Sequence, residues 1–158
     1  MKEYKLWSHQ SDGIEQLRQA YSEGSQRMCF VAPPGAGKSL VMREVIIPLI
    51  RNGKRVNIYL NRRMLTAQTL TYYRGIGIRF GVVAADHPEL RDINAPLQIC
   101  SIQTVASRQS RWDFEFPWCD FFFVDEKHQQ VNEQAESCLL YTSPSPRDAT
   151  LSRMPSSA

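Results

Sequence analysis

Two short segments of the chain carry residue types suited to phosphate chemistry. The first, residues 32–39, reads Ala-Pro-Pro-Gly-Ala-Gly-Lys-Ser and follows an apolar run. Glycine lets backbone N–H groups approach phosphate oxygens because no Cβ stands in the way, and a lysine adds positive charge. A serine hydroxyl directly after that lysine can bind Mg²⁺. We therefore expect a nucleotide-binding loop formed by Pro34, Gly35, Ala36, Gly37, Lys38 and Ser39.

The second segment is an acidic pair, Asp125 and Glu126, which directly follows the apolar residues 121–124. One carboxylate near the phosphates can hold Mg²⁺, and another can orient an attacking water and take its proton. We expect Asp125 to be a metal ligand together with Ser39, and Glu126 to be the general base. Lys38 would hold the phosphates during the reaction. The two segments together predict an Mg²⁺-dependent ATP hydrolase.

Each of these motifs also has an ordinary structural interpretation. A glycine turn between a strand and a helix need not bind anything, and two acids can lie in a surface turn. His128, taken alone, is typical of a solvent-facing histidine. The apolar runs before both motifs, and the presence of both in one chain, favour the catalytic interpretation.

Length, composition and charge limit the remaining possibilities. The 158 residues have room for one domain, and 42% of them are hydrophobic, which suits a packed core. We find no apolar run long enough to cross a bilayer and no secretory leader, so we expect a cytoplasmic protein without a membrane partner. The net charge of +3 is too small to establish a nucleic-acid partner. The four cysteines lack metal-ligand spacing, and we expect Cys29, Cys100 and Cys119 to be buried thiols.

Apolar runs alternate with helical periodicity along residues 1–137. Helices are expected from His9 to Gly24, over 38–51 and from about 62 to 73, and strands over 28–32, 55–60, 79–84, 97–102 and 121–124. Pro48 predicts a kink or an early end in the second helix. Fully apolar strands separated by helices predict an α/β fold with a parallel sheet covered on both faces. Ligands in such folds bind at the carboxyl ends of the strands, where both motifs fall.

The composition changes abruptly near Ser137. Residues 138–148 contain two Ser-Pro steps without periodicity, and residues 152–158 are similar, as is typical of a disordered tail. Back-translated, the two stretches match both ends of a DNA adapter used to build sequencing libraries, in one frame and with room for an index between them. We therefore expect residues 1–137 to be a domain incomplete at its C-terminus, and residues 138–158 to be a translated adapter.

The order of motifs resembles the first RecA-like domain of superfamily 2 helicases and translocases. The likeness is strongest to the DEAH-like group with type III restriction motor subunits and RadD-like helicases. Residues 6–10 resemble the opening segment of that group, whose Gln reads adenine, and this implies the same role for Gln10. Trp7 stands where the family commonly has Arg. Residues 32–39 resemble motif I in the family's own form, which begins with Ala.

Two further segments resemble motifs that contact nucleic acid. Residues 60–68 resemble motif Ia, which touches the nucleic-acid backbone, and we expect Arg62 and Arg63 to bind phosphates there. Plain solvation of these two arginines is an equal alternative. Residues 100–105 resemble a later segment whose Thr contacts the strand, and this implies that role for Thr104.

The acidic segment resembles motif II, which usually reads DEAH or DECH. Here it reads Asp-Glu-Lys-His, so Lys127 departs from the pattern, with an open effect on the metal site. In the family, the His at the position of His128 couples the state of ATP to the second domain. The likeness spans roughly residues 5–130, nearly all of the expected domain.

The resemblance implies an ATP-dependent helicase or translocase that acts on nucleic acid, with DNA favoured over RNA. A second RecA-like domain of the parent chain would supply an arginine finger, which is worth several powers of ten in rate. We therefore expect weak ATP hydrolysis by this chain alone. Two alternatives stay open, a small ATP-binding switch module that does not translocate and a P-loop kinase. The segment Glu126–His128 and the motif Ia likeness argue against the kinase.

Overall fold

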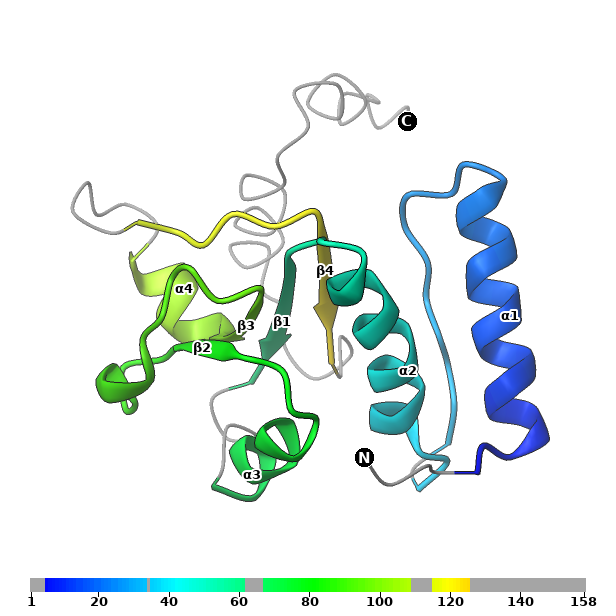
Figure 1. Cartoon of the computed structure of the whole chain (residues 1–158), viewed down its shortest axis with the longest axis horizontal. Coiled ribbons are helices and arrows are strands. Elements are labelled where there is room, and N and C mark those ends of the chain that lie inside the picture. The colour runs from blue at the N-terminus through cyan, green and yellow to red at the C-terminus, as the bar shows by residue number, and fades with distance from the viewer. Residues whose placement is uncertain (1–4, 34, 62–66, 109–114, 126–158) are drawn as a thin grey trace, which may run out of the picture. The chain divides into compact units, whose positions relative to one another are not determined.

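The computed structural model describes residues 5–33, 35–61, 67–108 and 115–125, and each structural statement below concerns these residues. The chain divides into two compact units, Met1–Gly53 and Lys54–Ala158. The first contains two long helices, and the second contains a parallel sheet with shorter helices (Figure 1). The fold is therefore α/β, as the alternation of apolar runs predicts.

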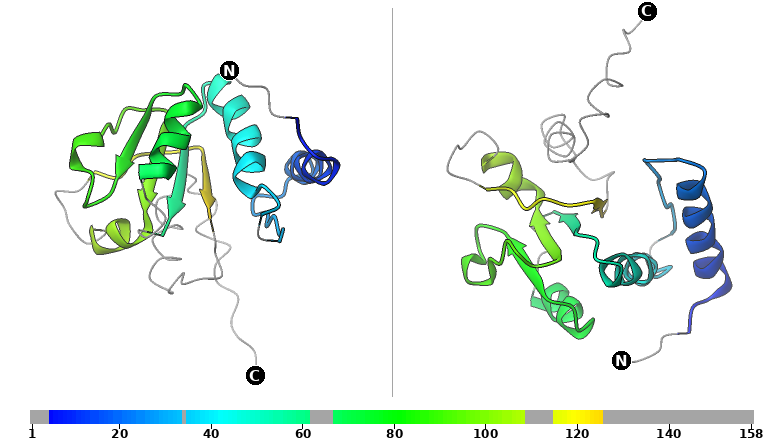
Figure 2. Two further views of the ribbon diagram at one scale, coloured as in Figure 1. Left: turned by 90° about the horizontal axis from the view of Figure 1, so that it is seen from below. Right: turned by 45° about the horizontal axis from the view of Figure 1, so that its top comes forward.

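The first unit is built from helix α1 (Ser8–Ser22) and helix α2 (Lys38–Arg51). The two helices pack against each other, and they are neighbours in Figure 1 and in both views of Figure 2. Ile14 of α1 is buried, as are Val41 and Ile46 of α2. The apolar spacing of both helices thus supplies the core of this unit.

Pro48 does not end α2, which continues to Arg51, so the predicted early end is wrong. A proline lacks the N–H that would bond to the carbonyl four residues earlier. The last turn still closes, because the N–H of Asn52 donates to the Pro48 carbonyl at 3.0 Å and that of Gly53 donates to the Ile50 carbonyl, also at 3.0 Å. A single missing bond one turn from the end is tolerated here.

The strand expected over residues 28–32 is absent from the sheet of the described residues, and this prediction is wrong for the structure. Val31 is 86% exposed, and Cys29 is exposed rather than buried. Phe30 of this segment lies against α1, where a Cβ added to Gly13 would lie 2.5 Å from the Phe30 ring. An apolar run becomes a strand only when its backbone pairs with another strand, and this backbone joins none of the observed ladders.

The second unit holds a four-stranded sheet in the order β2-β3-β1-β4. The strands are β1 (Val56–Leu60), β2 (Phe80–Val83), β3 (Leu97–Ser101) and β4 (Phe121–Val124), and all three pairings are parallel. Every residue of β1 and β3 is buried. Because successive side chains point to opposite faces, both faces of these central strands are covered. Four predicted strands are thus confirmed within one or two residues.

Short helices connect the strands of this unit. They are α3 (Ala67–Gly75), the 3₁₀ turn η2 (Pro88–Leu90) and α4 (Ile102–Arg108). The described part of α3 overlaps the helix predicted from about residue 62 to 73 and ends two residues after it, at Gly75. Helix α4 was not predicted, because it begins directly where β3 ends.

The amino ends of β1 and β4 are joined by a reciprocal contact. The Arg55 N–H donates to the Asp120 carboxylate at 2.8 Å, and the Asp120 N–H donates to the Arg55 carbonyl at 2.9 Å. The Arg55 guanidinium also donates to the Ile93 carbonyl at 2.7 Å. These contacts fix the register in which Val56 lies opposite Phe121, and this register places Asp125 beyond the end of β4.

Candidate functional site

The loop ahead of α2 has a backbone conformation that calls for glycine at two positions. Gly35 has φ of 80° and Gly37 has φ of 77°, both in the left-handed region that other residues rarely adopt. A Cβ added to Gly37 would also collide with the side-chain nitrogen of Gln10, whereas one added to Gly35 would meet no atom within 4 Å. Conformation alone therefore requires Gly35, and both conformation and packing require Gly37.

Gly37 is the N-cap of α2, a helix of 14 residues. The Gly37 carbonyl accepts the N–H groups of Leu40 at 2.9 Å and Val41 at 3.2 Å. Within the described part of the chain, no side chain caps this end of the helix. The positive end of the helix dipole is thus left for an anion, as in known phosphate sites.

Two side chains of the predicted nucleotide site follow at the start of α2. Lys38 is half-buried, and its Nζ donates to the Ala32 carbonyl at 2.9 Å, so the lysine folds back across the loop. Ser39 is exposed. A phosphate could therefore reach both side chains once the Lys38 ammonium exchanges the Ala32 carbonyl for a phosphate oxygen.

Gln10 connects the first turn of α1 to this loop. Its side chain is buried; its Oε1 accepts the Trp7 N–H at 3.0 Å, and its Nε2 donates to the Ala36 carbonyl at 2.9 Å. The carboxamide therefore already uses its acceptor and one donor N–H inside the protein. Its predicted contact with adenine stays a prediction. The bond to Ala36 also gives Gln10 a structural role, because it joins α1 to the loop. The sequence did not indicate this role, since the two residues are 26 positions apart.

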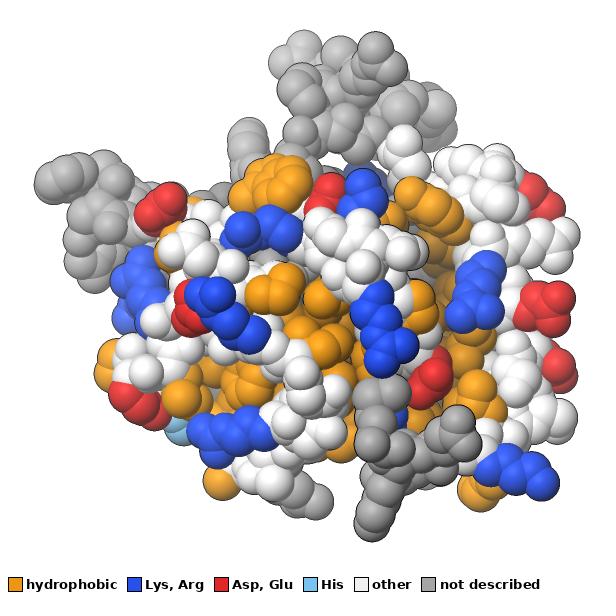
Figure 3. Space-filling model, viewed as in Figure 1, with side chains coloured by type: hydrophobic (Ala, Val, Ile, Leu, Met, Phe, Trp, Pro, Cys, Tyr) orange, Lys and Arg blue, Asp and Glu red, His pale blue; other side chains and the backbone are white. Residues whose placement is uncertain are grey.

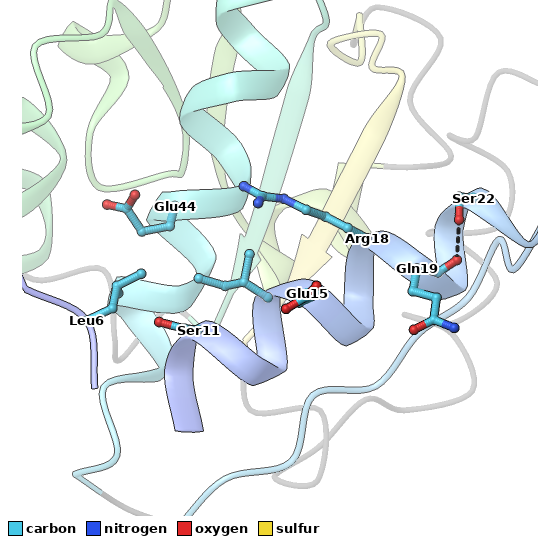
Figure 4. A pocket seen from close by; sticks show the side chains of 8 residues that line it. Leu6, Ser11, Glu15, Arg18, Gln19, Ser22 and Glu44 are labelled. Atoms are coloured by element: carbon cyan, nitrogen blue, oxygen red, sulfur yellow. Dashed lines mark hydrogen bonds between the residues drawn. The ribbon is translucent and has the colours of Figure 1, made fainter. Parts of the chain in front are cut away.

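A groove lies against the loop within the first unit. It is lined by Trp7, His9, Asp12, Gly13, Gln16, Phe30, Val31, Ala32, Pro33, Gly35 and Ala36. A second groove, shown in Figure 4, is lined by Glu15, Arg18 and Glu44 among others. The second groove mixes two carboxylates with one guanidinium, which is a poor match for a triphosphate. The first is the candidate site because it includes the loop.

Asp125 extends the β1–β4 ladder by one bond, since its N–H donates to the Tyr59 carbonyl at 3.1 Å. The residue is half-buried at the carboxyl end of β4. Its charge reaches Tyr73 of α3: burial, the neighbouring Tyr72 and the Asp125 charge, in that order, raise the pKa of the Tyr73 hydroxyl. Tyr73 is therefore a neutral phenol near the acidic motif. The sequence alone gave no signal for this relationship, because Tyr73 reads as a core residue of a helix.

Thr104 lies in the first turn of α4, near the end of β3. Its side chain is buried, and its Oγ1 accepts the Ala85 N–H at 3.2 Å. Its own N–H donates to the Ser101 hydroxyl at 3.4 Å. The preceding residue, Gln103, is exposed and donates to the Asn61 side chain at 3.2 Å. The hydroxyl of Thr104 thus has a structural partner, and its contact with nucleic acid stays a prediction.

Several predicted site residues lie outside the described residues. They are Pro34, Arg62, Arg63, Glu126 and His128, and Lys127 lies outside as well. Among the described residues, no group of three or more His, Cys, Asp or Glu side chains gathers to hold a metal. On the face seen in Figure 3, the described Lys and Arg side chains are dispersed among apolar and polar ones. The charge pattern of that face therefore does not by itself mark a nucleic-acid interface.

A left-handed glycine loop at the start of a helix, together with a parallel sheet whose strand β4 ends at an acid, defines an α/β domain of the P-loop type. The chain belongs to the family described as "Type III restriction enzyme, res subunit", whose model matches residues 3–147. This is the helicase-like group that the motifs resemble. The matched range runs past Ser137, and the domain boundary there stays a prediction.

Among the solved structures that are similar to the chain, one matches it with a TM-score of 0.57 and 18% sequence identity. It is a nuclease-deletion mutant of the Type ISP restriction-modification enzyme LlaGI in complex with a DNA substrate mimic. The match covers 78% of this chain and 15% of that chain, and at this identity it shows the fold alone. No curated protein sequence matches the chain. Among the described residues, no helix has the length and apolar character needed to span a membrane.

Proposed function

We propose that the chain is the first motor domain of an ATP-dependent nucleic-acid helicase or translocase. The observation that carries the proposal is the loop ahead of α2. Gly37 is left-handed and lies against Gln10, where no side chain would fit, and it begins a long helix without a side-chain cap. This arrangement suits a phosphate group. Membership of the family supports its use in a motor.

The residue types of the two motifs suit a triphosphate with Mg²⁺. Ser39 is exposed and Asp125 is half-buried, and a hydroxyl and a carboxylate are oxygen ligands of the kind that Mg²⁺ prefers. In this proposal these two residues hold the ion. When bound, Mg²⁺ neutralises charge that develops on the phosphates. Lys38 leaves the Ala32 carbonyl and binds the β- and γ-phosphates.

The remaining roles follow from the motifs. Glu126 orients the attacking water and takes its proton. His128 transmits the state of the nucleotide to a second RecA-like domain, which lies outside this chain and supplies an arginine to the transition state. The chain spans only 15% of the length of its solved relative, so further domains are expected. Gln10 positions the loop and the base. The isolated chain then hydrolyses ATP slowly.

The proposed partner is nucleic acid, with DNA favoured over RNA because the solved relative was captured with a DNA mimic. Arg62 and Arg63 would bind backbone phosphates, and Thr104 would stand beside the strand. Contacts with phosphates position a strand without reading its bases. Recognition by this domain is therefore expected to be independent of sequence.

A phosphate-release assay with and without single-stranded DNA tests the proposal. We expect Mg²⁺-dependent binding of ATP, slow turnover and loss of binding in Lys38→Ala. A Lys54→Ala variant is the matched control, because Lys54 is an exposed lysine of the second unit, 3.8 Å from Asp120. ATP binding that is unaffected by Lys38→Ala would refute the proposed site. Fast DNA-stimulated turnover by residues 1–137 would refute the need for a second domain. If residues 138–158 are a translated adapter, residues 1–137 and 1–158 are expected to bind and hydrolyse ATP equally.

The alternative of an ATP-binding switch module differs in its response to nucleic acid. The double variant Arg62→Ala, Arg63→Ala is expected to weaken single-strand binding and to flatten its dependence on salt, since each lost phosphate contact lowers the number of released counterions. Unchanged binding and an unchanged salt slope would favour the switch module. The absence of any phosphorylated small-molecule product would exclude the kinase.

A further inference from the structure

The carbonyl oxygen of Ala36, in the loop ahead of α2, lies within hydrogen-bonding distance of two side chains of α1. The Gln10 amide donates to it at 2.9 Å, and the Nε2 atom of His9 lies 3.4 Å from it. The Gln10 bond is partly buried, whereas the His9 contact is exposed to solvent. The roles derived so far involve Gln10 and leave His9 unassigned.

The Ala36 carbonyl selects the protonation state of the His9 ring. A carbonyl oxygen only accepts hydrogen bonds, so the contact is a bond when Nε2 carries a proton. The neutral tautomer with its proton on Nδ1 would instead place two lone pairs face to face. The neutral Nε2–H tautomer and the imidazolium ion both donate, and the charged donor forms the stronger bond. Protonation of His9 therefore tightens its hold on the loop.

A second contact orients the ring of His9. The Trp7 indole meets it edge to face, with ring centroids 5.5 Å apart and an interplanar angle of 60°. The Trp7 carbonyl accepts the N–H groups of Gln10 at 3.0 Å and Ser11 at 3.1 Å, so Trp7 is fixed to the first turn of α1. The His9 ring is exposed, yet it is held between an aromatic neighbour and the loop carbonyl.

Few other charges lie in this part of the first unit. Among the described residues that line the groove beside the loop, the ionisable ones are His9 and Asp12, both on α1. Residues 30–36 contain no ionisable side chain. The next charge along the chain is Lys38 at the start of α2, whose ammonium donates to the Ala32 carbonyl. A positive charge on His9 would thus attract an anion in the loop together with Lys38 and against Asp12.

We propose that His9 is a positioning residue of the loop and that its protonation strengthens the binding of a polyphosphate there. This inference rests on the proposed function and adds a dependence on pH. The imidazolium ion holds the Ala36 carbonyl and brings a positive charge toward the anion, and both effects favour binding. Histidine is the side chain that gains its proton as the pH falls from 8 to 5. The site is therefore expected to bind polyphosphate more tightly in mild acid.

The test measures binding of inorganic tripolyphosphate with Mg²⁺ by calorimetry at pH 8.0 and pH 5.5. This ligand has no base, so recognition of a base plays no part. The full chain is compared with His9→Gln, which keeps a neutral N–H donor but gains no charge, and with His9→Ala, which has neither. His87→Gln is the matched control, because His87 lies in the second unit beside Glu89. Circular dichroism at both pH values verifies the fold of each variant.

At pH 8.0 we expect His9→Gln to bind within about twofold of the unmodified chain and His9→Ala to bind about threefold more weakly, since a neutral hydrogen bond is lost. At pH 5.5 the unmodified chain is expected to bind about fivefold more tightly than His9→Gln, because only histidine carries the charge. Protonation of the ligand affects both proteins equally and cancels in this ratio. His87→Gln should follow the unmodified chain at both pH values.

Nitrogen-15 NMR of the histidine rings tests the hydrogen bond without any ligand. At pH 8.0 the neutral His9 ring is expected to carry its proton on Nε2, as the Ala36 carbonyl requires. A ring with its proton on Nδ1 would overturn the inference whether or not the loop binds polyphosphate.

Two binding results would also overturn it. An affinity ratio between the unmodified chain and His9→Gln that is the same at both pH values would mean that the charge on His9 does not reach the loop. Equal affinities of the unmodified chain and His9→Ala at pH 5.5 would mean that His9 has no part in binding. Failure of the proposed function has a separate signature, which is that tripolyphosphate does not bind at either pH or binds equally well to Lys38→Ala. The inference would then fall with it.

Discussion

The side-chain nitrogen of Gln10 donates to the carbonyl of Ala36 at 2.9 Å, and this bond joins the first helix to the loop that precedes the second. The same nitrogen occupies the space in which a Cβ at Gly37 would stand. Three features of the site therefore depend on one side chain: the start of α1, the loop carbonyl and the requirement for glycine. A change in any one of them is expected to alter the other two.

Gly37→Ala is expected to destabilise the loop and to weaken ATP binding at least tenfold. The new methyl group collides with Gln10, and the left-handed backbone adds about 1–2 kcal/mol of strain for a residue with a Cβ. Gly35→Ala is the matched control, because it has similar strain but no collision. Thermal unfolding and calorimetry measure both effects.

The double variant Gln10→Ala, Gly37→Ala isolates the collision from the strain. Removal of the Gln10 amide frees the space, so the double variant is expected to recover part of the stability lost in Gly37→Ala. The two changes then show a coupling energy of about 0.5–3 kcal/mol. Strict additivity of the two losses would contradict the predicted contact.

Much of the fold could be predicted because each strand of the second unit is a short, mainly apolar run. Residues of β1 and β3 are buried on both faces, with Asn57 and Gln98 as buried polar residues among apolar ones, and such a run is typical of a strand covered on both sides. The loop could be predicted as well, since Gly35 and Gly37 meet a backbone requirement that is local. These features depend on residue type and near neighbours alone.

Features that depend on distant partners could not be predicted. The run 28–32 is as apolar as a strand, yet composition does not say which backbone pairs with it, and it forms no strand here. Helix α4 is seven residues long, too short for a periodic pattern to emerge. The bonds of Gln10 and Thr104 join residues 26 and 19 positions apart, so their engagement is visible only in the structure.

Thr104→Val is expected to lower stability by about 0.5–1.5 kcal/mol, because the Ala85 N–H loses its acceptor in a partly buried hydrogen bond. Valine preserves the volume, so packing around α4 is retained. If the hydroxyl serves only this bond, binding of single-stranded DNA to the variant changes less than twofold. Fluorescence anisotropy with a labelled strand, alongside chemical unfolding, measures both quantities.

Gln103→Ala provides the matched comparison for Thr104. Gln103 is exposed, so its loss is expected to change stability by less than about 0.5 kcal/mol. A larger effect on DNA binding from Gln103→Ala than from Thr104→Val would assign the strand contact to the exposed amide. A larger effect on DNA binding from Thr104→Val than from Gln103→Ala would support the contact with the strand that the family resemblance implies for Thr104.

The Arg79–Asp92 ion pair is expected to contribute to the loss of folding stability as the pH falls into the acid range. The guanidinium donates two bonds to the carboxylate, at 2.6 and 2.8 Å, and this bonding and the Arg79 charge hold the pKa of Asp92 below its ordinary value. A depressed folded-state pKa gives stability that is present above the unfolded pKa and is lost as pH falls through the folded one. The contribution therefore disappears below the usual Asp range.

Arg79→Gln tests this ion pair. It removes the charge, so the variant is expected to show a shallower loss of stability on acidification than the unmodified chain. Arg79 is exposed and Asp92 is partly exposed, so the difference is expected to shrink in 1 M salt. Thermal unfolding between pH 2 and 7 measures it, and an identical acid limb in the two proteins would contradict the prediction.

Tyr73 is expected to report on the charge of Asp125. Burial first, then Tyr72 and Asp125, raise the pKa of the Tyr73 hydroxyl above its ordinary value. A group whose folded-state pKa is raised adds stability that is present below the unfolded pKa, near 10 for tyrosine, and is lost as pH rises toward the folded one. The chain should therefore lose stability above pH 10, and Tyr73→Phe should reduce that loss.

Asp125→Asn separates the charge from the burial. The amide keeps the shape of the side chain but removes the negative charge, so the pKa of Tyr73 falls only in part, because burial is the larger cause. Carbon-13 NMR of ring-labelled tyrosine follows each hydroxyl separately, and Tyr21, which is 54% exposed, serves as the internal reference. Mg²⁺ with a non-hydrolysable ATP analogue should lower the pKa of Tyr73 in the same direction, since a bound cation offsets the Asp125 charge. A Tyr73 titration that is indifferent to both changes would place the Asp125 carboxylate away from this phenol and from the proposed metal.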